Sequence, residues 1–238
     1  LLITGDEEGY ATNGTKKVVD YLKKKKEKIN FCIVGEPTNP KKLGEMIKIG
    51  RRGSLTAELE VYGTQGHIAY PHLSNNPINT LIKICSELKR KKLDKGNKNF
   101  QPSNLEFTRL FVENKAHNVI PSSAKTQFNV RYNNLQTASK LKRKINIIIN
   151  KISKKNKCGF KINYLESGES FITKRGKNIL LAKKIIKKIT KLNPVLSTTG
   201  GTSDARFIKK IAPCLEFGLV NKTMHKIDEC VSLKDLSN

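Results

Sequence analysis

Several features that would place this 238-residue chain in other classes of protein are missing from its sequence. It has no apolar run long enough to span a bilayer, and its first residues lack the basic-then-apolar pattern of a secretory leader. No internal repeat is visible. Its five cysteines form no C-x-x-C pair and lie among apolar neighbours, at positions 32, 85, 158, 214 and 230. These absences predict a cytoplasmic protein with no membrane partner and with reduced, buried thiols.

Acidic residues are also scarce. The sequence has 46 Lys and Arg against 20 Asp and Glu, a formal net charge of +26. This excess invites a nucleic-acid-binding interpretation, which predicts an affinity that falls steeply with salt. However, only eight of the basic residues are Arg, Lys is accompanied by abundant Asn and Ile, and no aromatic residues are interleaved with basic runs such as 23–26. We therefore attribute the charge to coding bias and expect no specific nucleic-acid partner.

The spacing of apolar residues indicates an α/β chain interrupted by a second unit. Helical spacing over 15–24 and a short apolar run at 31–35 predict a helix followed by a buried parallel strand. Between 53 and 165 the pattern changes to alternating strands and two helices, in the order β-α-β-β-α-β. Helix and buried-strand patterns return from 176. We expect a discontinuous α/β domain over 1–52 and 166–238, with a ferredoxin-like (split βαβ) insert over 53–165.

Both ends of the chain have the pattern of interrupted elements. The opening residues Leu-Leu-Ile-Thr predict the second half of a buried strand, and the first residue is not Met. Residues 232–238 predict the start of a helix. We therefore expect the sequence to be part of a longer polypeptide.

Carboxylates follow two of the predicted buried strands. Glu7 and Glu8 lie in a Gly-Asp-Glu-Glu-Gly segment after the first strand, and Glu36 follows the strand at 31–35. In open α/β sheets, ligands collect at the carboxyl ends of the strands. Adjacent acids repel one another unless a cation or a buried proton relieves them. A solvated acidic turn is the simpler alternative for Glu7 and Glu8 alone, whereas two strand ends with carboxylates favour a shared site.

Two glycine-rich loops and one histidine add to this set. His225 follows the strand at 214–218, and an imidazole near carboxylates is a ligand set that Zn²⁺, Co²⁺ or Mn²⁺ accepts. His67 lies in the loop 63–72, where it could donate to a developing oxyanion. The Gly-Gly-Thr-Ser-Asp loop at 200–204 could bind a carboxylate through its backbone amides. Each feature alone has an ordinary alternative: a surface histidine, a hairpin loop and a tight turn.

Taken together and in order, these segments resemble those of the succinyl-diaminopimelate desuccinylases, within the wider group of two-zinc peptidases and aminoacylases. The segments are GDEEG, VGEP, GRRGS, GHIAYPH, NVIP, FNVRY, GGTSDARF and TMHKIDE, and they cover essentially the whole chain. The resemblance implies a zinc-peptidase-like catalytic domain with an inserted dimerisation domain that forms a homodimer. It also implies hydrolysis of N-succinyl-LL-2,6-diaminopimelate, a small-molecule substrate, in lysine and diaminopimelate biosynthesis.

The resemblance further implies a role for each matching residue. Glu7 is the general base, and Glu8 and His225 are ligands to one zinc ion and Glu36 to the other, with Co²⁺ as an alternative in one site. His67 reaches the neighbouring subunit's site and stabilises the tetrahedral intermediate. The expected substrate contacts are Arg51, Ser54, Tyr70, Asn118, Arg131, Thr202 and Asn221.

The chain also departs from the family pattern. The family's first zinc-binding His, the Asp near it and the Asp that bridges both metals lie upstream of GDEEG, and none is present here. We therefore expect the chain by itself to bind metal poorly and to be inactive. His117 stands where a small polar residue is expected. The alternatives are a related amidohydrolase, such as an acetylornithine deacetylase or a dipeptidase, and a non-catalytic homologue.

Overall fold

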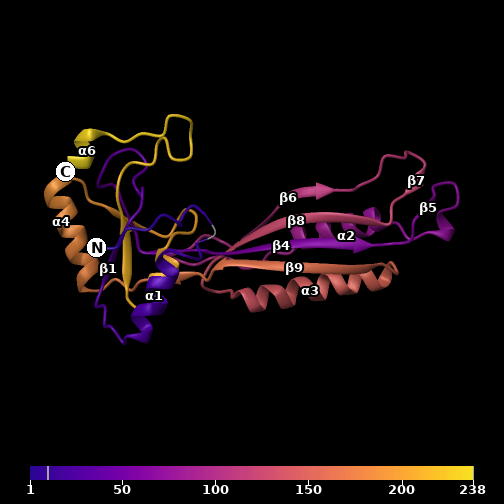
Figure 1. The fold of residues 1–238 in the computed structure, drawn as a ribbon, viewed down its shortest axis with the longest axis horizontal. Helices are drawn as coiled ribbons and strands as arrows, with labels where there is room; N and C mark the ends of the chain where they lie inside the picture. The colour runs from indigo at the N-terminus through magenta and orange to yellow at the C-terminus, as the bar shows by residue number, and fades with distance from the viewer. Residues whose placement is uncertain (10, 238) are drawn as a thin grey trace. The chain divides into compact units, whose positions relative to one another are not determined.

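The computed structural model describes residues 1–9 and 11–237, and the chain divides into two compact units. The first unit combines Leu1–Arg52 with Ser170–Asn238, and the second is Gly53–Glu169. The expected fold class, an α/β domain interrupted by a ferredoxin-like insert, is confirmed (Figure 1).

The first unit is built on a four-stranded sheet with helices on both faces. Its strand order is β1-β12-β2-β11, formed by Cys32–Gly35, Cys214–Phe217, Met46–Lys48 and Val195–Ser197. The pairs β1/β12 and β11/β2 are parallel, and β12 meets β2 in the antiparallel sense. The unit's helices are α1 (Thr15–Lys24), α4 (Lys177–Thr190), α5 (Ala205–Ile208) and α6 (Leu233–Ser237). A short antiparallel pair, β3 (Gly50–Arg51) with β10 (Phe171–Ile172), completes it.

The two faces of this sheet carry separate apolar clusters because neighbouring residues of a strand point to opposite sides. Cys214 packs with Val19 of α1 and with Ala205 and Ile208 of α5. The next residue of β12, Leu215, packs in a second cluster that includes Ile179 and Ile186 of α4. The carboxyl ends of β1 and β12 are thereby held between two helical layers.

The second unit is an antiparallel sheet in the strand order β6-β8-β4-β9. Its elements are β4 (Gly53–Tyr62), α2 (Pro77–Arg90), β6 (Asn104–Phe111), β8 (Ser123–Tyr132), α3 (Ala138–Lys155) and β9 (Gly159–Gly168). Chain order and strand order together match the predicted split βαβ arrangement. β9 continues to Gly168, three residues beyond the strand end that the sequence indicates. A short antiparallel pair of β5 (Gly66–His67) and β7 (Val119–Ile120), with the 3-10 turn η1 (Pro71–Leu73), extends from this unit.

The alternating pattern of β4 decides which face of this sheet is buried. Leu55, Ala57, Leu59 and Val61 are at most 1% exposed and form one core with apolar side chains of α2 and α3. Glu58 lies on the opposite, exposed face. The α2 helix begins as its sequence predicts: the Asn76 side chain accepts a hydrogen bond from the amide of Ile78 at 2.9 Å, and Pro77 opens the first turn.

Two local expectations are wrong. The opening residues form no strand: Leu1 and Ile3 are exposed, because no described segment pairs with them and a strand requires a hydrogen-bonded neighbour. Cys230 is exposed, since it lies in a loop rather than in a strand or helix of the core.

In the part of the chain that the structure describes, no helix combines the length and the apolar character that crossing a membrane requires.

Candidate functional site

The segment that contains Glu7 and Glu8 is a loop stabilised by hydrogen bonds to the Asp6 side chain. The Asp6 carboxylate accepts hydrogen bonds from the amides of Thr12 and Asn13, each at 2.6 Å. The hydrogen bond from the Asn13 amide is the main cause that lowers the pKa of Asp6. The Asp6 carboxylate is therefore occupied by hydrogen bonds from the loop backbone. Of the three adjacent acids, Glu7 and Glu8 can still bind a metal or act in catalysis.

Asp204 attaches this loop to the rest of the unit. Its Oδ2 accepts a hydrogen bond from Thr15 Oγ1 at 2.5 Å and a longer one from Thr4 Oγ1 at 3.5 Å. Thr4 and Thr15 lie on either side of the Glu7–Glu8 pair, so one buried carboxylate holds both ends of the loop. Asp204 Oδ1 is buried and has no hydrogen-bond partner among the described residues.

Glu7 and Glu36 lie in a common acidic environment at the ends of neighbouring segments. Burial raises the pKa of Glu7, and the charges of Glu8 and Asp204 raise it further. Burial is also the main cause that raises the pKa of Glu36 to about 7, followed by the charges of Glu216 and Glu7. The structure therefore brings together the carboxylates that the sequence places at two strand ends. Such a cluster favours either a proton or a cation.

The three predicted metal ligands are not assembled into one site. Across residues 1–9 and 11–237, no group of three His, Cys, Asp or Glu side chains is placed to hold a metal ion. His225 lies in an exposed loop with a φ of 58°, and its amide donates to Glu229 Oε2 at 3.2 Å. Glu8 is exposed. The acidic environment of Glu36 and the unpartnered oxygen of Asp204 fit a divalent cation, but Glu8, Glu36 and His225 together form only part of a metal site.

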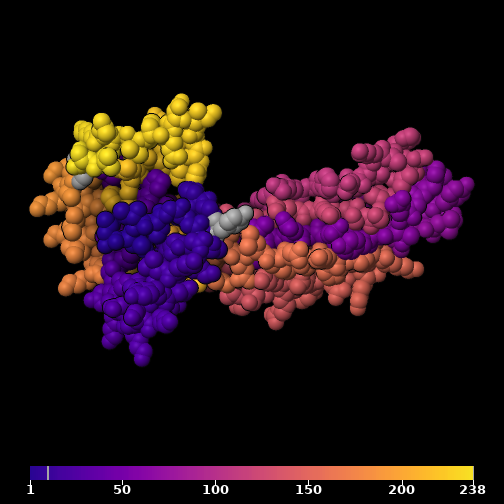
Figure 2. Space-filling model, viewed as in Figure 1, coloured from indigo at the N-terminus to yellow at the C-terminus, as the bar shows by residue number. Residues whose placement is uncertain are grey.

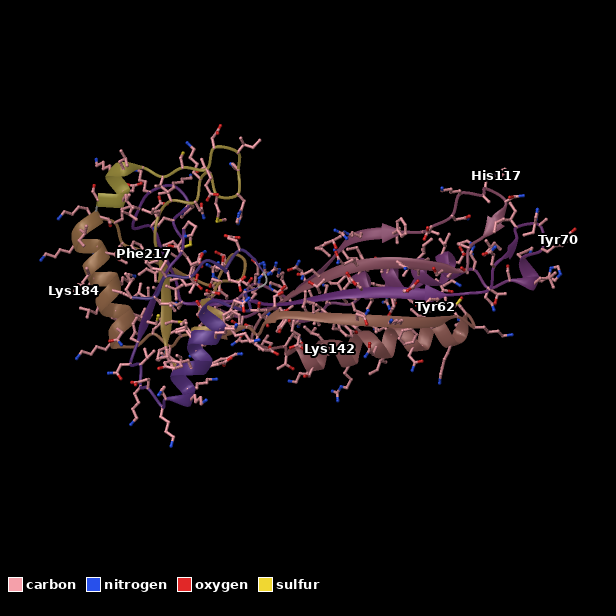
Figure 3. The ribbon with its side chains drawn as sticks, in the orientation of Figure 1. Tyr62, Tyr70, His117, Lys142, Lys184 and Phe217 are labelled. Atoms are coloured by element: carbon pink, nitrogen blue, oxygen red, sulfur yellow. The ribbon has the colours of Figure 1, made fainter. Side chains whose placement is uncertain are left out.

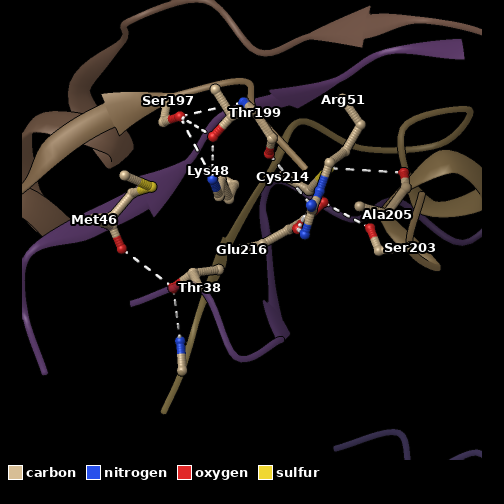
Figure 4. A network of polar contacts seen from close by, with 11 residues as sticks. Thr38, Met46, Lys48, Arg51, Ser197, Thr199, Ser203, Ala205, Cys214 and Glu216 are labelled. Carbon is tan, nitrogen blue, oxygen red and sulfur yellow. Dashed lines mark hydrogen bonds and ion pairs between the residues drawn. The ribbon is translucent and has the colours of Figure 1, made fainter. Parts of the chain in front are cut away.

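Arg51 differs from its expected role as a free partner for a substrate carboxylate. Its Nε and Nη2 atoms both donate to Glu216 Oε2, the former at 2.8 Å, in a buried ion pair (Figure 4). Glu216 Oε1 accepts from Ser203 Oγ at 2.6 Å. The Nη1 atom of Arg51 lies 3.4 Å from the carbonyl oxygen of Thr199. The Nε–Nη2 edge of the guanidinium is thus occupied by Glu216 and cannot bind a substrate carboxylate in this structure.

A buried lysine lies beside this ion pair. Lys48 is 7% exposed, and its Nζ donates to Thr199 Oγ1 at 2.6 Å and to Ser197 Oγ at 3.5 Å (Figure 4). Burial is the main cause that lowers the pKa of Lys48 to about 8, and the charge of Arg51 lowers it further. Neither Lys48 nor Glu216 is predicted from the sequence as a site residue. Their signal is a charged residue inside a short apolar strand, which is costly unless the charge is paired or used.

Two predicted substrate-contact residues of the first unit, Thr202 and Asn221, lie in loops. Thr202 is half-buried in the Gly200–Gly201 loop, next to Ser203. The amide of Asn221 donates to the carbonyl oxygen of Asn39 at 2.9 Å, so its backbone is attached to the segment that follows Glu36. The Asn39 side chain donates to the carbonyl oxygen of Gly218 at 2.5 Å and completes the attachment.

The second unit contains the other predicted residues in two places. On β4 and β8, Ser54 pairs in register with Arg131. Ser54 is 2% exposed and its hydroxyl oxygen accepts from Asn129 Nδ2 at 3.1 Å, which leaves its proton to donate to another group. Burial lowers the pKa of Arg131.

His67, Tyr70 and Asn118 gather at the β5–β7 pair. Asn118 Nδ2 lies 3.5 Å from His67 Nε2, and the ring centroids of His67 and Tyr70 are 6.0 Å apart. The amide of Ala69 donates to His67 Nδ1 at 3.1 Å, which places the proton of a neutral imidazole on Nε2. Figures 2 and 3 show this region at one end of the second unit, with Tyr70 and the exposed His117 in it. With its proton on Nε2, His67 does not accept a hydrogen bond from Asn118 Nδ2, so Nε2 is a donor for a ligand.

The chain is similar to known proteins over almost its whole length. Residues 49–157 match the family model described as a peptidase dimerisation domain. The chain is 66% identical over 236 residues to the succinyl-diaminopimelate desuccinylase of Pelagibacter ubique, covering 99% of this chain and 62% of that protein. It is 50% identical to the enzyme of the same name from Methylobacterium radiotolerans, covering 99% of this chain and 60% of the relative. The chain thus spans about three fifths of the length of these relatives.

Solved structures share the fold at low sequence identity. The crystal structure of aminopeptidase PepT from Bacillus cereus matches with a TM-score of 0.79 at 16% identity, over 99% of this chain and 60% of that one. A tripeptidase from Staphylococcus aureus matches with a TM-score of 0.74 at 15% identity, over 94% of this chain and 57% of that one. These two matches support the fold. Over 99% of its length the chain is similar to succinyl-diaminopimelate desuccinylases, and residues 49–157 match a peptidase dimerisation domain.

Proposed function

We propose that the full-length protein carrying this chain hydrolyses N-succinyl-LL-2,6-diaminopimelate to succinate and LL-2,6-diaminopimelate. The reaction would serve lysine and diaminopimelate biosynthesis in the cytoplasm. The observation that carries this proposal is the 66% identity over 236 residues to the succinyl-diaminopimelate desuccinylase of Pelagibacter ubique. The matched region covers 99% of this chain and therefore includes the segments that contain the predicted site residues. The acidic environment of Glu7 and Glu36 supports a hydrolytic site in the first unit.

The proposed reaction requires a divalent metal, for which the donors in this chain are Glu8, Glu36 and His225. We assign Glu8 and His225 to one zinc ion and Glu36 to a second, with Co²⁺ able to replace zinc in one site. When bound, the metals polarise the amide carbonyl and lower the pKa of a water molecule. The remaining ligands lie outside this chain, consistent with the incomplete set that it presents.

Glu7 is the proposed general base. It takes a proton from the attacking water and later delivers it to the nitrogen of the leaving amine. A raised pKa suits both steps, because a base whose pKa lies closer to the working pH can also act as the acid. The brace formed by Asp6 and the attachment through Asp204 hold this residue in place.

His67 is the proposed oxyanion donor, acting on the site of a neighbouring subunit. Its Nδ1 already accepts a hydrogen bond from the Ala69 amide, so its Nε2 can donate to the oxygen of the tetrahedral intermediate. A homodimer formed through the second unit supports this arrangement, since residues 49–157 match a peptidase dimerisation domain. Asn118 and Tyr70 lie beside His67 at the β5–β7 pair.

The substrate is a small molecule with several carboxylates. Residues that could bind it in the proposal are Arg51, Ser54, Tyr70, Asn118, Arg131, Thr202 and Asn221. Arg51 can offer only its Nη1 edge, because Glu216 occupies its Nε and Nη2 atoms.

The test is an assay of the full-length protein supplemented with zinc or cobalt. Succinate release from N-succinyl-LL-2,6-diaminopimelate is the expected result. If acetylornithine or a dipeptide is hydrolysed instead, the substrate is wrong but the reaction class stands. If the metal binds and none of these substrates is hydrolysed, the protein is a non-catalytic homologue and the proposal fails.

A further inference from the structure

The ion pair between Arg51 and Glu216 is buried on both sides. The exposed fractions of the two side chains are 10% and 1%. Removing two charges from water costs free energy that their mutual attraction only partly offsets, and apolar residues of similar volume are often equally stable. Stability alone therefore does not account for this pair.

Glu216 connects two separate segments through its two oxygens. Oε2 accepts from Nε and Nη2 of Arg51, at the end of β3. Oε1 accepts from Ser203 Oγ at 2.6 Å, in the loop before α5 (Figure 4). Because Glu216 is 1% exposed and fixed in β12 between β1 and β2, it is a rigid reference point for both segments.

The edge of Arg51 that Glu216 does not contact lies directly against the same loop. Its Nη1 donates one hydrogen bond to the carbonyl oxygen of Thr199 at 3.4 Å and keeps a second N–H for a ligand. At Gly200, where φ is +106°, a Cβ would lie 2.4 Å from Nη1. The loop can approach the guanidinium this closely only because residue 200 has no side chain. Loop 199–203 is thus held between Arg51 on one side and Glu216 on the other.

We propose that Glu216 is a positioning residue for substrate binding: it orients the Nη1 edge of Arg51 and, through Ser203, fixes the adjacent loop that carries Thr202. These two groups then meet one carboxylate of the substrate. Glu216 also compensates the charge of Arg51, so that Arg51 contributes directional hydrogen bonds rather than net charge. This inference rests on the proposed function for the identity of the substrate, but the orientation of Arg51 can be measured without turnover.

The test compares Glu216→Gln, Glu216→Asp and Ser203→Ala in the full-length, metal-loaded protein, with Glu106→Gln as the control. Glu106 also forms an ion pair, with Lys89, but on an exposed surface of the second unit. Glu216→Gln is expected to raise KM for N-succinyl-LL-2,6-diaminopimelate and the inhibition constant of succinate about tenfold, with a smaller change in kcat. Glu216→Asp should restore part of the affinity, and Ser203→Ala should raise KM by less than Glu216→Gln does.

Arginine labelled with ¹⁵N at Nε gives a signal that does not depend on activity. Arg51 Nε, held by Glu216, is expected to give a slowly exchanging resonance that Arg51→Lys identifies and Glu216→Gln abolishes. Unchanged KM and succinate affinity in all three variants would overturn the inference, as would an Arg51 resonance that survives in Glu216→Gln. If the unmodified protein does not hydrolyse the substrate, the proposed function fails, and the resonance still decides whether Glu216 orients Arg51. If Glu216→Gln does not fold, the KM values of Glu216→Asp and Ser203→Ala decide.

Discussion

The Thr15 hydroxyl donates a hydrogen bond to Asp204 Oδ2 at 2.5 Å, although the two residues are 189 positions apart in the chain. This hydrogen bond connects the first residue of α1 with the residue that precedes α5. Because the Glu7–Glu8 loop leads into α1, the bond also fixes the end of that loop. Asp204 is buried, so loss of the hydrogen bond from Thr15 leaves Asp204 Oδ2 with only the long contact to Thr4.

Replacing Thr15 with valine should therefore destabilise the protein. The substitution keeps the shape of the side chain and removes one buried donor, at a cost of about 1–3 kcal/mol in the free energy of unfolding. Urea denaturation of the full-length protein measures this change. Thr108→Val is the matched control, since the Thr108 hydroxyl bonds to Gln127 on an exposed surface and should cost less than about 0.5 kcal/mol. Equal effects of the two substitutions would contradict the importance of the Asp204 contact.

Glu7→Gln should separate catalysis from metal binding. The amide cannot take a proton from water, and we expect kcat to fall by about 10²–10⁴-fold while the metal content stays unchanged. Metal analysis of the purified variant and steady-state kinetics test both parts. Glu27→Gln, an exposed change outside the site, should leave both unaltered. Retained turnover in Glu7→Gln would remove Glu7 from the role of base.

Gly200 and Gly201 offer a comparison between adjacent positions. Alanine at Gly200 meets a φ of +106° and a Cβ position 2.4 Å from Arg51 Nη1, whereas alanine at Gly201 meets no atom within 4 Å. We expect Gly200→Ala to lower the free energy of unfolding by about 1–3 kcal/mol and to raise KM. Gly201→Ala should change both quantities little. Similar KM values for the two variants would show that the close approach of Arg51 to this loop has no role in binding.

Lys48 should make stability depend on pH in the alkaline range. Its pKa is lowered from 10.5 to about 8 in the folded protein, so the unfolded chain binds more protons between these two values. The contribution of Lys48 to the free energy of unfolding should therefore rise as pH increases from about 8 towards 10.5, by roughly 1–3 kcal/mol. The thiols of Cys32, Cys85 and Cys214, whose pKa values burial raises, contribute in the opposite sense, so the measurement is the difference in slope between the unmodified protein and Lys48→Met in denaturation at several pH values. The exposed Lys184, changed to methionine, should leave the slope intact.

Local patterns were sufficient to predict the second unit. The alternation of Leu55 to Val61 reflects burial of one sheet face, and Asn76 with Pro77 marks a helix start, so each signal lies within a few residues of its effect. The contacts of Glu216 with Arg51 and Ser203 were not predictable, because they depend on which strand lies beside which in the folded sheet. The strand predicted for the opening residues does not form for the same reason. Its apolar residues have the pattern of a buried strand, but a strand also needs a neighbouring strand to pair with by hydrogen bonds.

His67 and Glu7 belong to different units of the chain, and the proposed mechanism places them in one site only across a dimer. His67→Ala and Glu7→Gln should each be nearly inactive as homodimers. When the two variants are co-expressed, half of the dimers are expected to be hybrids, each with one site that has both an intact Glu7 and an intact His67.

Activity of the co-expressed mixture should therefore reach about a quarter of the unmodified level, given random pairing of subunits. A double variant, Glu7→Gln with His67→Ala, co-expressed with either single variant provides the control, because no hybrid of that kind contains a complete site. If the mixture of single variants stays inactive although hybrids are detected by differential tags, His67 does not act across the dimer. If His67→Ala alone keeps full activity, the imidazole is not the oxyanion donor, and the hydrogen bond between the Ala69 amide and Nδ1 only stabilises the loop that follows β5.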